Sequence, residues 1–237
     1  MTVTPYHRLL EACQVRGCPL CTIEQQAVRR YLDNLFYENV NSPALRRRLR
    51  HSRGFCREHA WLIVNERLGD ALGVAIIYRD VLDSLLKDMA ANPPRSRKGR
   101  WPLALPDATA SQTETDPLTT HCPACVQRDE VTRSMLTVLV KSLTDAELQA
   151  ALRQSDGLCL RHFAMALHQA AGNEEAWRAL LDIQREKMNA LQTQLAEFIR
   201  KNDYRYFSEG FGPEGDSWKR ALALVVGNNP WNMEGKT

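Results

Sequence analysis

The chain has 237 residues, of which 44% are hydrophobic and 25% charged, as in a globular protein of one large domain or two modest ones. Its net charge of +3 is too small to indicate nucleic-acid or membrane binding. No run of about 18 apolar residues predicts a membrane span. The N-terminus lacks the apolar core and cleavage site of a signal peptide. We therefore expect a cytoplasmic protein whose thiols stay reduced.

Apolar residues at intervals of three and four predict an all-α fold. This spacing follows Cys21 and recurs after Cys125, at Ile23, Ala27, Tyr31, Leu35 and Phe36 and at Val126, Val131, Met135, Leu139 and Val140. A short helix is expected to begin at Ser42-Pro43 and to end before Gly54. Its counterpart is expected after the capping box that starts at Thr144, and to end at Gly157.

Longer helices are predicted further along each half. One begins beside each C-x-x-H motif, and a long helix follows it. In the second half, this long helix carries a seam with alternating steps of four and three, which predicts packing against another helix; the seam is Trp177, Leu181, Gln184, Met188, Leu191, Leu195 and Phe198. A last short helix is expected from Asp216-Ser217 to Gly227.

The most specific pattern is C-P-x-C followed, after 34 residues in the first copy and 33 in the second, by C-x-x-H. The first copy comprises Cys18, Cys21, Cys56 and His59. The second comprises Cys122, Cys125, Cys159 and His162. Each copy holds three thiols and one imidazole, which is a complete tetrahedral ligand set for zinc.

This duplication predicts two homologous helical units, each closed by its own Cys3His site. The first unit is expected over residues 1–91 and the second over residues 118–200, joined by a Pro- and Arg-rich linker at residues 92–117. Residues 201–237 are expected to form an aromatic strap over the joint between the halves, the alternative being a lip for a ligand or partner. Cys13 remains as an ordinary thiol.

Two zinc ions per chain are the favoured cofactors, because Cys3His zinc sites are common and structural. An iron–sulfur cluster is the alternative, although clusters usually take four cysteines. Redox dithiols are disfavoured because no strand–helix–strand pattern surrounds either C-x-x-C.

The doubled motif and the closing Asp216-Ser217-Trp218 and Val225-Val226-Gly227 segments resemble a bacterial family known only as a domain of unknown function. The resemblance implies a helical protein with paired metal sites, and no established activity.

A basic run beside the first C-x-x-H motif is the main hint of a partner, and it has no match in the second half; it comprises Arg46, Arg47, Arg48, Arg50 and Arg53. A solvated face is the simplest interpretation. Nucleic acid and an acidic protein are the binding alternatives.

Catalytic motifs are absent, and Glu24, Glu38, Glu58 and Glu66 are predicted to be surface carboxylates. We therefore expect a non-catalytic metal-binding scaffold that acts as a binding or adaptor protein. The alternatives are an iron–sulfur or thiol-redox protein and a nucleic-acid-binding regulator.

Overall fold

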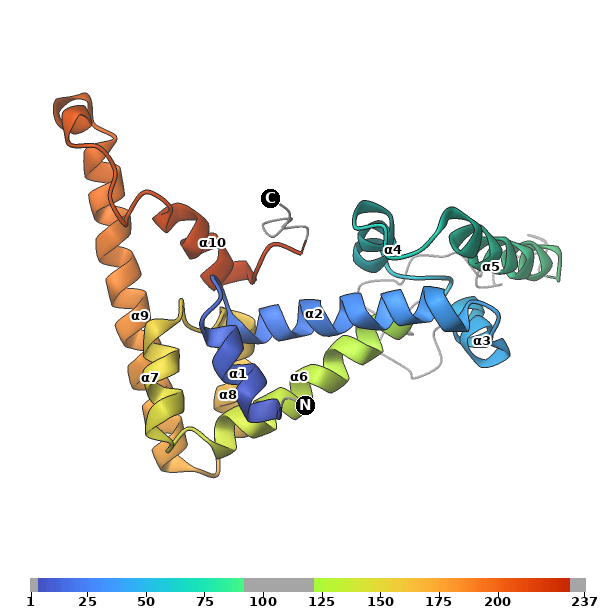
Figure 1. Cartoon of the computed structure of the whole chain (residues 1–237), viewed down its shortest axis with the longest axis horizontal. Coiled ribbons are helices and arrows are strands. Elements are labelled where there is room, and N and C mark those ends of the chain that lie inside the picture. Colours follow the sequence, from blue (N-terminus) through green and yellow to red (C-terminus); the bar gives the residue numbers. More distant parts are fainter. Residues whose placement is uncertain (1–3, 92–121, 231–237) are drawn as a thin grey trace, which may run out of the picture. The chain divides into compact units, whose positions relative to one another are not determined.

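The computed structural model describes residues 4–91 and 122–230, and these residues form helices and no strand (Figure 1). The predicted all-α fold is confirmed for this part of the chain. The helices, in order, are α1 (Pro5–Cys13), α2 (Pro19–Asn34), the π-helical turn η1 (Leu35–Asn39), α3 (Pro43–His51), α4 (Arg57–Asn65), α5 (Ala71–Ala91), α6 (Pro123–Lys141), α7 (Ala146–Gln154), α8 (Leu160–Gln169), α9 (Glu174–Lys201), the 3-10 turn η2 (Tyr204–Glu209) and α10 (Ser217–Val226). The predicted linker lies outside the described residues.

Capping residues fix the ends of the short helices. The Ser42 hydroxyl accepts a hydrogen bond from the Leu45 amide at the start of α3, as the Ser42-Pro43 signal predicted. In α7 the cap is Asp145 rather than Thr144, because the Asp145 carboxylate accepts hydrogen bonds from two amides of the first turn. Gly54 and Gly157 both have positive φ, which lets the chain turn sharply before each C-x-x-H motif.

The described helices divide into two compact units that do not follow the predicted halves. Of the described residues, 4–26 and 130–230 form one unit, called unit 1, and 27–91 and 122–129 form the other, called unit 2. Helices α2 and α6 therefore each contribute residues to both units. Each unit combines a segment from the first half of the chain with a segment from the second. The boundary between residues 91 and 118 predicted from composition thus does not coincide with the boundary between these units.

Unit 1 has its core where α1, α7, α8 and α9 meet the N-terminal part of α2 and the C-terminal part of α6. Leu9, Leu139, Leu143, Leu148 and Ala166 are fully buried there. The C-terminal residues pack on α9 and α8 of this same unit: Phe198 and Phe211 stack with ring centroids 5.1 Å apart, and Lys201 binds Glu214 at 2.8 Å. The α9 seam is thus partly covered by this tail. A strap over a joint between the halves stays a prediction.

Unit 2 packs α3 and α5 against α4 and the C-terminal part of α2, with Leu32, Leu49, Ile63 and Ile77 at its centre. The basic run lies on α3 and in the turn after it. Arg46 and Arg50 both bind the Asp80 carboxylate on α5, at 3.2 and 2.6 Å, and Arg53 binds Asp88 at 2.6 Å. Three of the five arginines therefore join α3 and its following turn to α5, instead of pointing only into solvent.

A buried glutamine on α9 holds the turn that precedes Cys159. The Gln184 side chain is 2% exposed; it accepts a hydrogen bond from the Leu158 amide at 3.1 Å and donates one to the Leu158 carbonyl at 2.8 Å. Gln184 is the single polar member of the predicted seam. Its polar side chain pairs with the backbone amide and carbonyl of this turn.

We expect Gln184→Leu to destabilise the protein by about 2–4 kcal/mol, because it leaves two buried backbone groups without partners. The free energy of unfolding from urea denaturation measures the loss. Gln192→Leu, at an exposed position of the same helix, is the matched control and should change stability by less than about 0.5 kcal/mol. Equal effects of the two substitutions would contradict a structural role for Gln184.

Candidate metal centre

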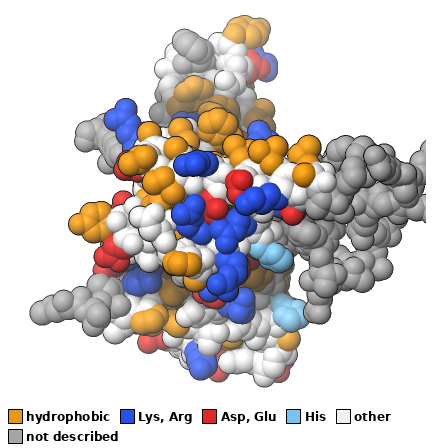
Figure 2. Space-filling view, turned by 90° about the vertical axis from the view of Figure 1, so that its right-hand side faces the viewer, with side chains coloured by type: hydrophobic (Ala, Val, Ile, Leu, Met, Phe, Trp, Pro, Cys, Tyr) orange, Lys and Arg blue, Asp and Glu red, His pale blue; other side chains and the backbone are white. Residues whose placement is uncertain are grey.

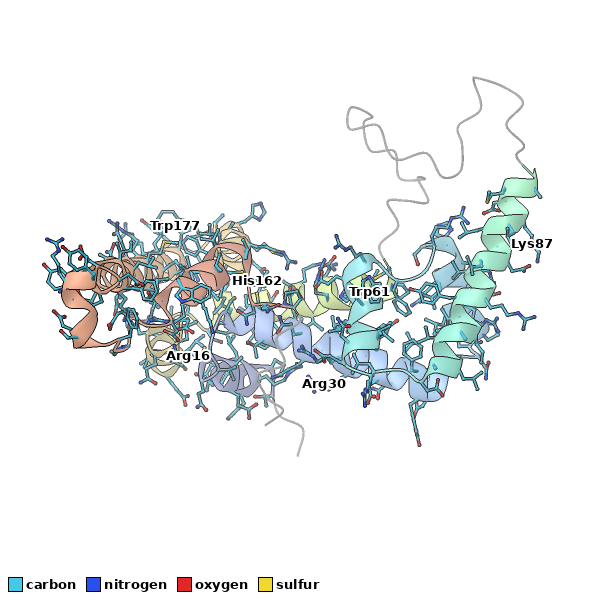
Figure 3. The ribbon with its side chains drawn as sticks, turned by 90° about the horizontal axis from the view of Figure 1, so that it is seen from above. Arg16, Arg30, Trp61, Lys87, His162 and Trp177 are labelled. Atoms are coloured by element: carbon cyan, nitrogen blue, oxygen red, sulfur yellow. The ribbon has the colours of Figure 1, made fainter. Side chains whose placement is uncertain are left out.

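The first group of ligands lies in unit 1, where the N-terminal turn of α2 meets the start of α8. Its members are Cys18, Cys21, Cys159 and His162, all buried. The Nδ1 atom of His162 lies 3.4 Å from the sulfurs of Cys18 and Cys21 and 3.3 Å from that of Cys159. The Cys21 and Cys159 sulfurs are 3.7 Å apart. Figure 3 shows His162 among the helices of unit 1. We call this group the α2–α8 site.

The second group lies in unit 2, where the start of α4 meets the N-terminal turn of α6. Its members are Cys56, His59, Cys122 and Cys125. The Nδ1 atom of His59 lies 3.1, 3.3 and 3.4 Å from the sulfurs of Cys56, Cys122 and Cys125. The Cys125 sulfur lies 3.3 Å from that of Cys122 and 3.6 Å from that of Cys56. We call this group the α4–α6 site.

The structure brings together all eight predicted ligands, but it corrects their pairing. The sequence predicted that each copy of the motif closes on itself. Instead, the C-P-x-C pair of the first copy meets the C-x-x-H pair of the second, and the reverse holds for the other two pairs. The physical reason is that α2 and α6 each contribute to both units, so each C-P-x-C pair lies in the unit that contains the other half's C-x-x-H helix.

Helix starts supply a favourable field at both sites. Cys56 and Cys159 are the N-cap residues of α4 and α8, and Pro19 and Pro123 are the first residues of α2 and α6, directly after Cys18 and Cys122. The partial positive charge of a helix N-terminus stabilises thiolates. Hydrogen bonds from Cys125 and Cys56 lower the pKa of Cys122 to about 3, and those from Cys18 and Cys21 lower the pKa of Cys159.

In the α2–α8 site, hydrogen bonds to the thiols and to Glu24 set the pKa of the His162 imidazole. Burial opposes the imidazolium charge, but hydrogen bonds with Cys159, Cys18 and Glu24 outweigh it and raise the pKa of His162 to about 11. A metal ion that binds here must therefore displace a proton from the imidazole nitrogen that becomes its ligand.

The distances within both groups fit a single tetrahedral ion. Zinc bonds of about 2.3 Å to sulfur and about 2.0 Å to nitrogen set tetrahedral edges of about 3.8 Å between sulfurs and about 3.5 Å between sulfur and nitrogen. The sulfur–sulfur separations of 3.3–3.7 Å and sulfur–nitrogen separations of 3.1–3.4 Å are slightly shorter than these edges. The two groups can therefore each hold one metal ion with four protein ligands.

A carboxylate that sequence reasoning placed on the surface is part of the α2–α8 site. Glu24 is 6% exposed, and its Oε1 atom accepts a hydrogen bond from His162 Nε2 at 3.0 Å. Thr132 donates a hydrogen bond to the same oxygen, and Arg161 lies 3.3 Å from both oxygens. Burial opposes ionisation, but the hydrogen bonds from His162 and Thr132 and the charge of Arg161 leave the pKa of Glu24 lowered. The signal in the sequence was its position three residues after Cys21, on the ligand face of the helix.

The other candidates remain apart from both metal-ligating groups. Cys13 is buried, and burial raises its pKa to about 12, so it stays an inert thiol. Residues of α3 and α5 line an open surface pocket, namely Arg47, Arg48, Arg50, His51, Arg53, Ser84 and Asp88. Figure 2 looks onto this part of unit 2 and shows Lys and Arg side chains gathered there.

No helix in residues 4–91 or 122–230 is long and apolar enough to cross a membrane.

Residues 9–232 match the model of a family of unknown function, DUF6062. The chain is similar to an uncharacterised 23.9 kDa protein encoded in the xynA 3′ region of Caldicellulosiruptor sp. strain Rt8B.4, with 27% identity over 225 residues that cover 92% of this chain and 99% of the relative. No solved structure matches the chain. The match over nearly the whole length means that this chain belongs to the DUF6062 family, whose function is unknown.

Proposed function

We propose that the protein is a non-catalytic helical scaffold that binds two zinc ions as structural staples and acts by binding another protein. The observation that carries the proposal is that two groups of three cysteines and one histidine each bring four ligand atoms within 4.8 Å of one another, which is the number that a tetrahedral ion takes. A catalytic zinc keeps one position open for water or substrate, whereas a structural zinc has four protein ligands. The donor sets therefore support a staple rather than a reaction centre.

Zinc is favoured over an iron–sulfur cluster by the spacing of the sulfurs. In a cluster at most two protein ligands bind the same iron atom, so the four ligand atoms cannot all lie as close together as around one ion, whereas here all four lie within 4.8 Å of one another. Here sulfurs of the same site lie 3.3–3.7 Å apart, so one ion suits the site better than a cluster. Three thiolates and one imidazole are also a common zinc set.

A protein partner is favoured over nucleic acid because three of the five arginines of the basic run already form ion pairs within the chain. Arg46, Arg50 and Arg53 already bind Asp80 and Asp88, and these carboxylates would repel phosphates. Counterion release from the run is therefore smaller than five free arginines would supply. Arg47 and Arg48 are left as the charges that a partner can contact.

The proposal predicts close to two equivalents of zinc in protein purified without added metal. Plasma emission spectrometry measures the metal content, and a visible spectrum of anaerobically purified protein should lack the absorption of an iron–sulfur cluster. A strong chelator should lower the melting temperature, since structural zinc adds on the order of 10 kcal/mol of apparent binding free energy in small domains. Folded protein with less than half an equivalent of any transition metal would contradict the proposal.

A further inference from the structure

The two metal-ligating groups use matching positions of the repeat, yet their surroundings differ in charge. Glu24 lies three residues after Cys21, and the residue three positions after Cys125 is Arg128. Arg161 lies two residues after Cys159, and the residue two positions after Cys56 is Glu58. The carboxylate and the guanidinium have thus exchanged places. The carboxylate that contacts the histidine of the α2–α8 site has an arginine at its counterpart position in the α4–α6 site.

Glu24 fixes the orientation of His162. Because Nδ1 faces the three sulfurs, Nε2 carries the hydrogen that Glu24 accepts at 3.0 Å. Thr132 and Arg161 hold the carboxylate in turn. Such a carboxylate–histidine–metal arrangement makes the imidazole a stronger ligand, and its loss typically costs 10–100-fold in metal affinity. Within residues 4–91 and 122–230 no carboxylate is found on His59 Nε2, and the counterpart of Glu24, Arg128, has no atom that could accept its hydrogen.

The C-terminal residues cover the α2–α8 site as well. The Asn228 side chain accepts a hydrogen bond from the Cys18 amide at 2.7 Å and donates one to the Cys18 carbonyl at 3.2 Å. Gly227 lies so close that a Cβ atom there would be 3.3 Å from the Cys21 sulfur. In the α4–α6 site Cys56 is only half-buried, so water and chelators reach its sulfur more readily.

We infer that the α2–α8 site is a permanent staple, that the α4–α6 site exchanges its metal, and that Glu24 is the positioning residue behind the difference. This inference rests on the proposed function, since it concerns metal held by the same ligands. It assigns to the α4–α6 site a dependence on metal supply that the α2–α8 site does not share.

Release of zinc to an excess of a coloured chelator tests this inference on the full chain. We expect two phases of about one equivalent each, with the slower phase at least about tenfold slower. Cys56→Ser should remove the fast phase and keep the slow one. Glu24→Gln should accelerate only the slow phase, by about 10–100-fold. Thr132→Val, which removes one support of Glu24 and keeps the charge, should accelerate the same phase less.

The matched control is Glu58→Gln, because Glu58 makes no hydrogen bond or ion pair within the described part of the chain. It should leave both phases unchanged, and circular dichroism confirms that each variant is folded. Two equivalents released in one phase would overturn the inference and leave the proposed function intact. Acceleration of both phases by Glu24→Gln would overturn the positioning role. Less than half an equivalent of metal would instead refute the proposed function itself.

A second, independent observation concerns the outer face of α5. Six residues at alternating steps of three and four are all exposed on this helix; they are Leu72, Ala75, Arg79, Leu82, Leu86 and Met89, which we call the α5 seam. Leu72, Leu82 and Leu86 are 67%, 57% and 64% exposed. The buried face of α5, with Ile77 and Val81, packs on the core of unit 2. Figure 2 shows hydrophobic side chains in a row beside the Lys and Arg side chains that gather on this unit.

Alternating steps of three and four match the a and d positions of a coiled coil, so the seam fits another helix. We propose that its occupant is the α5 seam of a second copy, in antiparallel orientation. In a register centred between Asp80 and Val81, Leu72 faces Met89 of the partner subunit. In the same register Ala75 faces Leu86 of the partner subunit, so a small side chain lies opposite a large one. Arg79 then comes within reach of Asp83 of the partner subunit. A parallel pairing would instead place two Arg79 side chains together, which is unfavourable.

Sedimentation velocity over a range of micromolar concentrations tests this pairing, and the wild-type chain should be a dimer. Leu82→Glu with Leu86→Glu should give a folded monomer, because the seam is exposed in the single chain. Leu222→Glu, at a 57% exposed position of α10, is the control and should stay dimeric. Arg79→Glu should weaken the dimer by repulsion from Asp83, whereas Arg79→Leu should strengthen it. A monomeric wild type, or a dimer that survives the double change, would overturn the proposal.

Discussion

Crossed closure of the two metal-ligating groups is the constraint on which the described architecture depends. The first turn of α2 is joined to α8, and the first turn of α6 is joined to α4. Both α2 and α6 then continue into the other unit, since the boundaries fall after Gln26 and Asp129, within these helices. Each metal-ligating group therefore fixes a helix that the opposite unit also needs for its core.

The entropy of loop closure does not explain why the chain chooses this pairing. Cys21 and Cys159 are 138 residues apart, about fourfold further than Cys21 and Cys56. Each doubling of loop length costs only about 0.6 kcal/mol, so the longer closure costs about 1 kcal/mol more. Zinc binding does not distinguish the two closures either, because both give two sets of three thiols and one imidazole. Packing of buried helix faces, such as Leu139, Leu148 and Ala166 in unit 1, decides which cysteines meet.

Local chemistry in the sequence predicted most of what is local in the structure. Ser42-Pro43 and the segment from Asp216 to Gly227 marked helix ends, and all eight of the cysteine and histidine residues that the structure brings into two groups were identified. Pairing was wrong because two copies of one motif offer two closures of nearly equal cost, and only tertiary packing distinguishes them. Glu24 was misplaced because the residues that hydrogen-bond to it, Thr132 and Arg161, lie more than a hundred residues away in the sequence. The arginine run was misjudged in part because its partners Asp80 and Asp88 lie two helices further along the chain, on α5.

Zinc content of two double variants tests the crossed closure most directly. Cys18→Ser with Cys159→Ser removes two ligands of the same site, so the account predicts that close to one equivalent of zinc remains. Cys18→Ser with Cys56→Ser removes one ligand from each site, and almost no tightly bound zinc should then remain. The reverse result, with zinc retained in the second variant and lost in the first, would mean that each half of the chain closes on itself and would contradict the account.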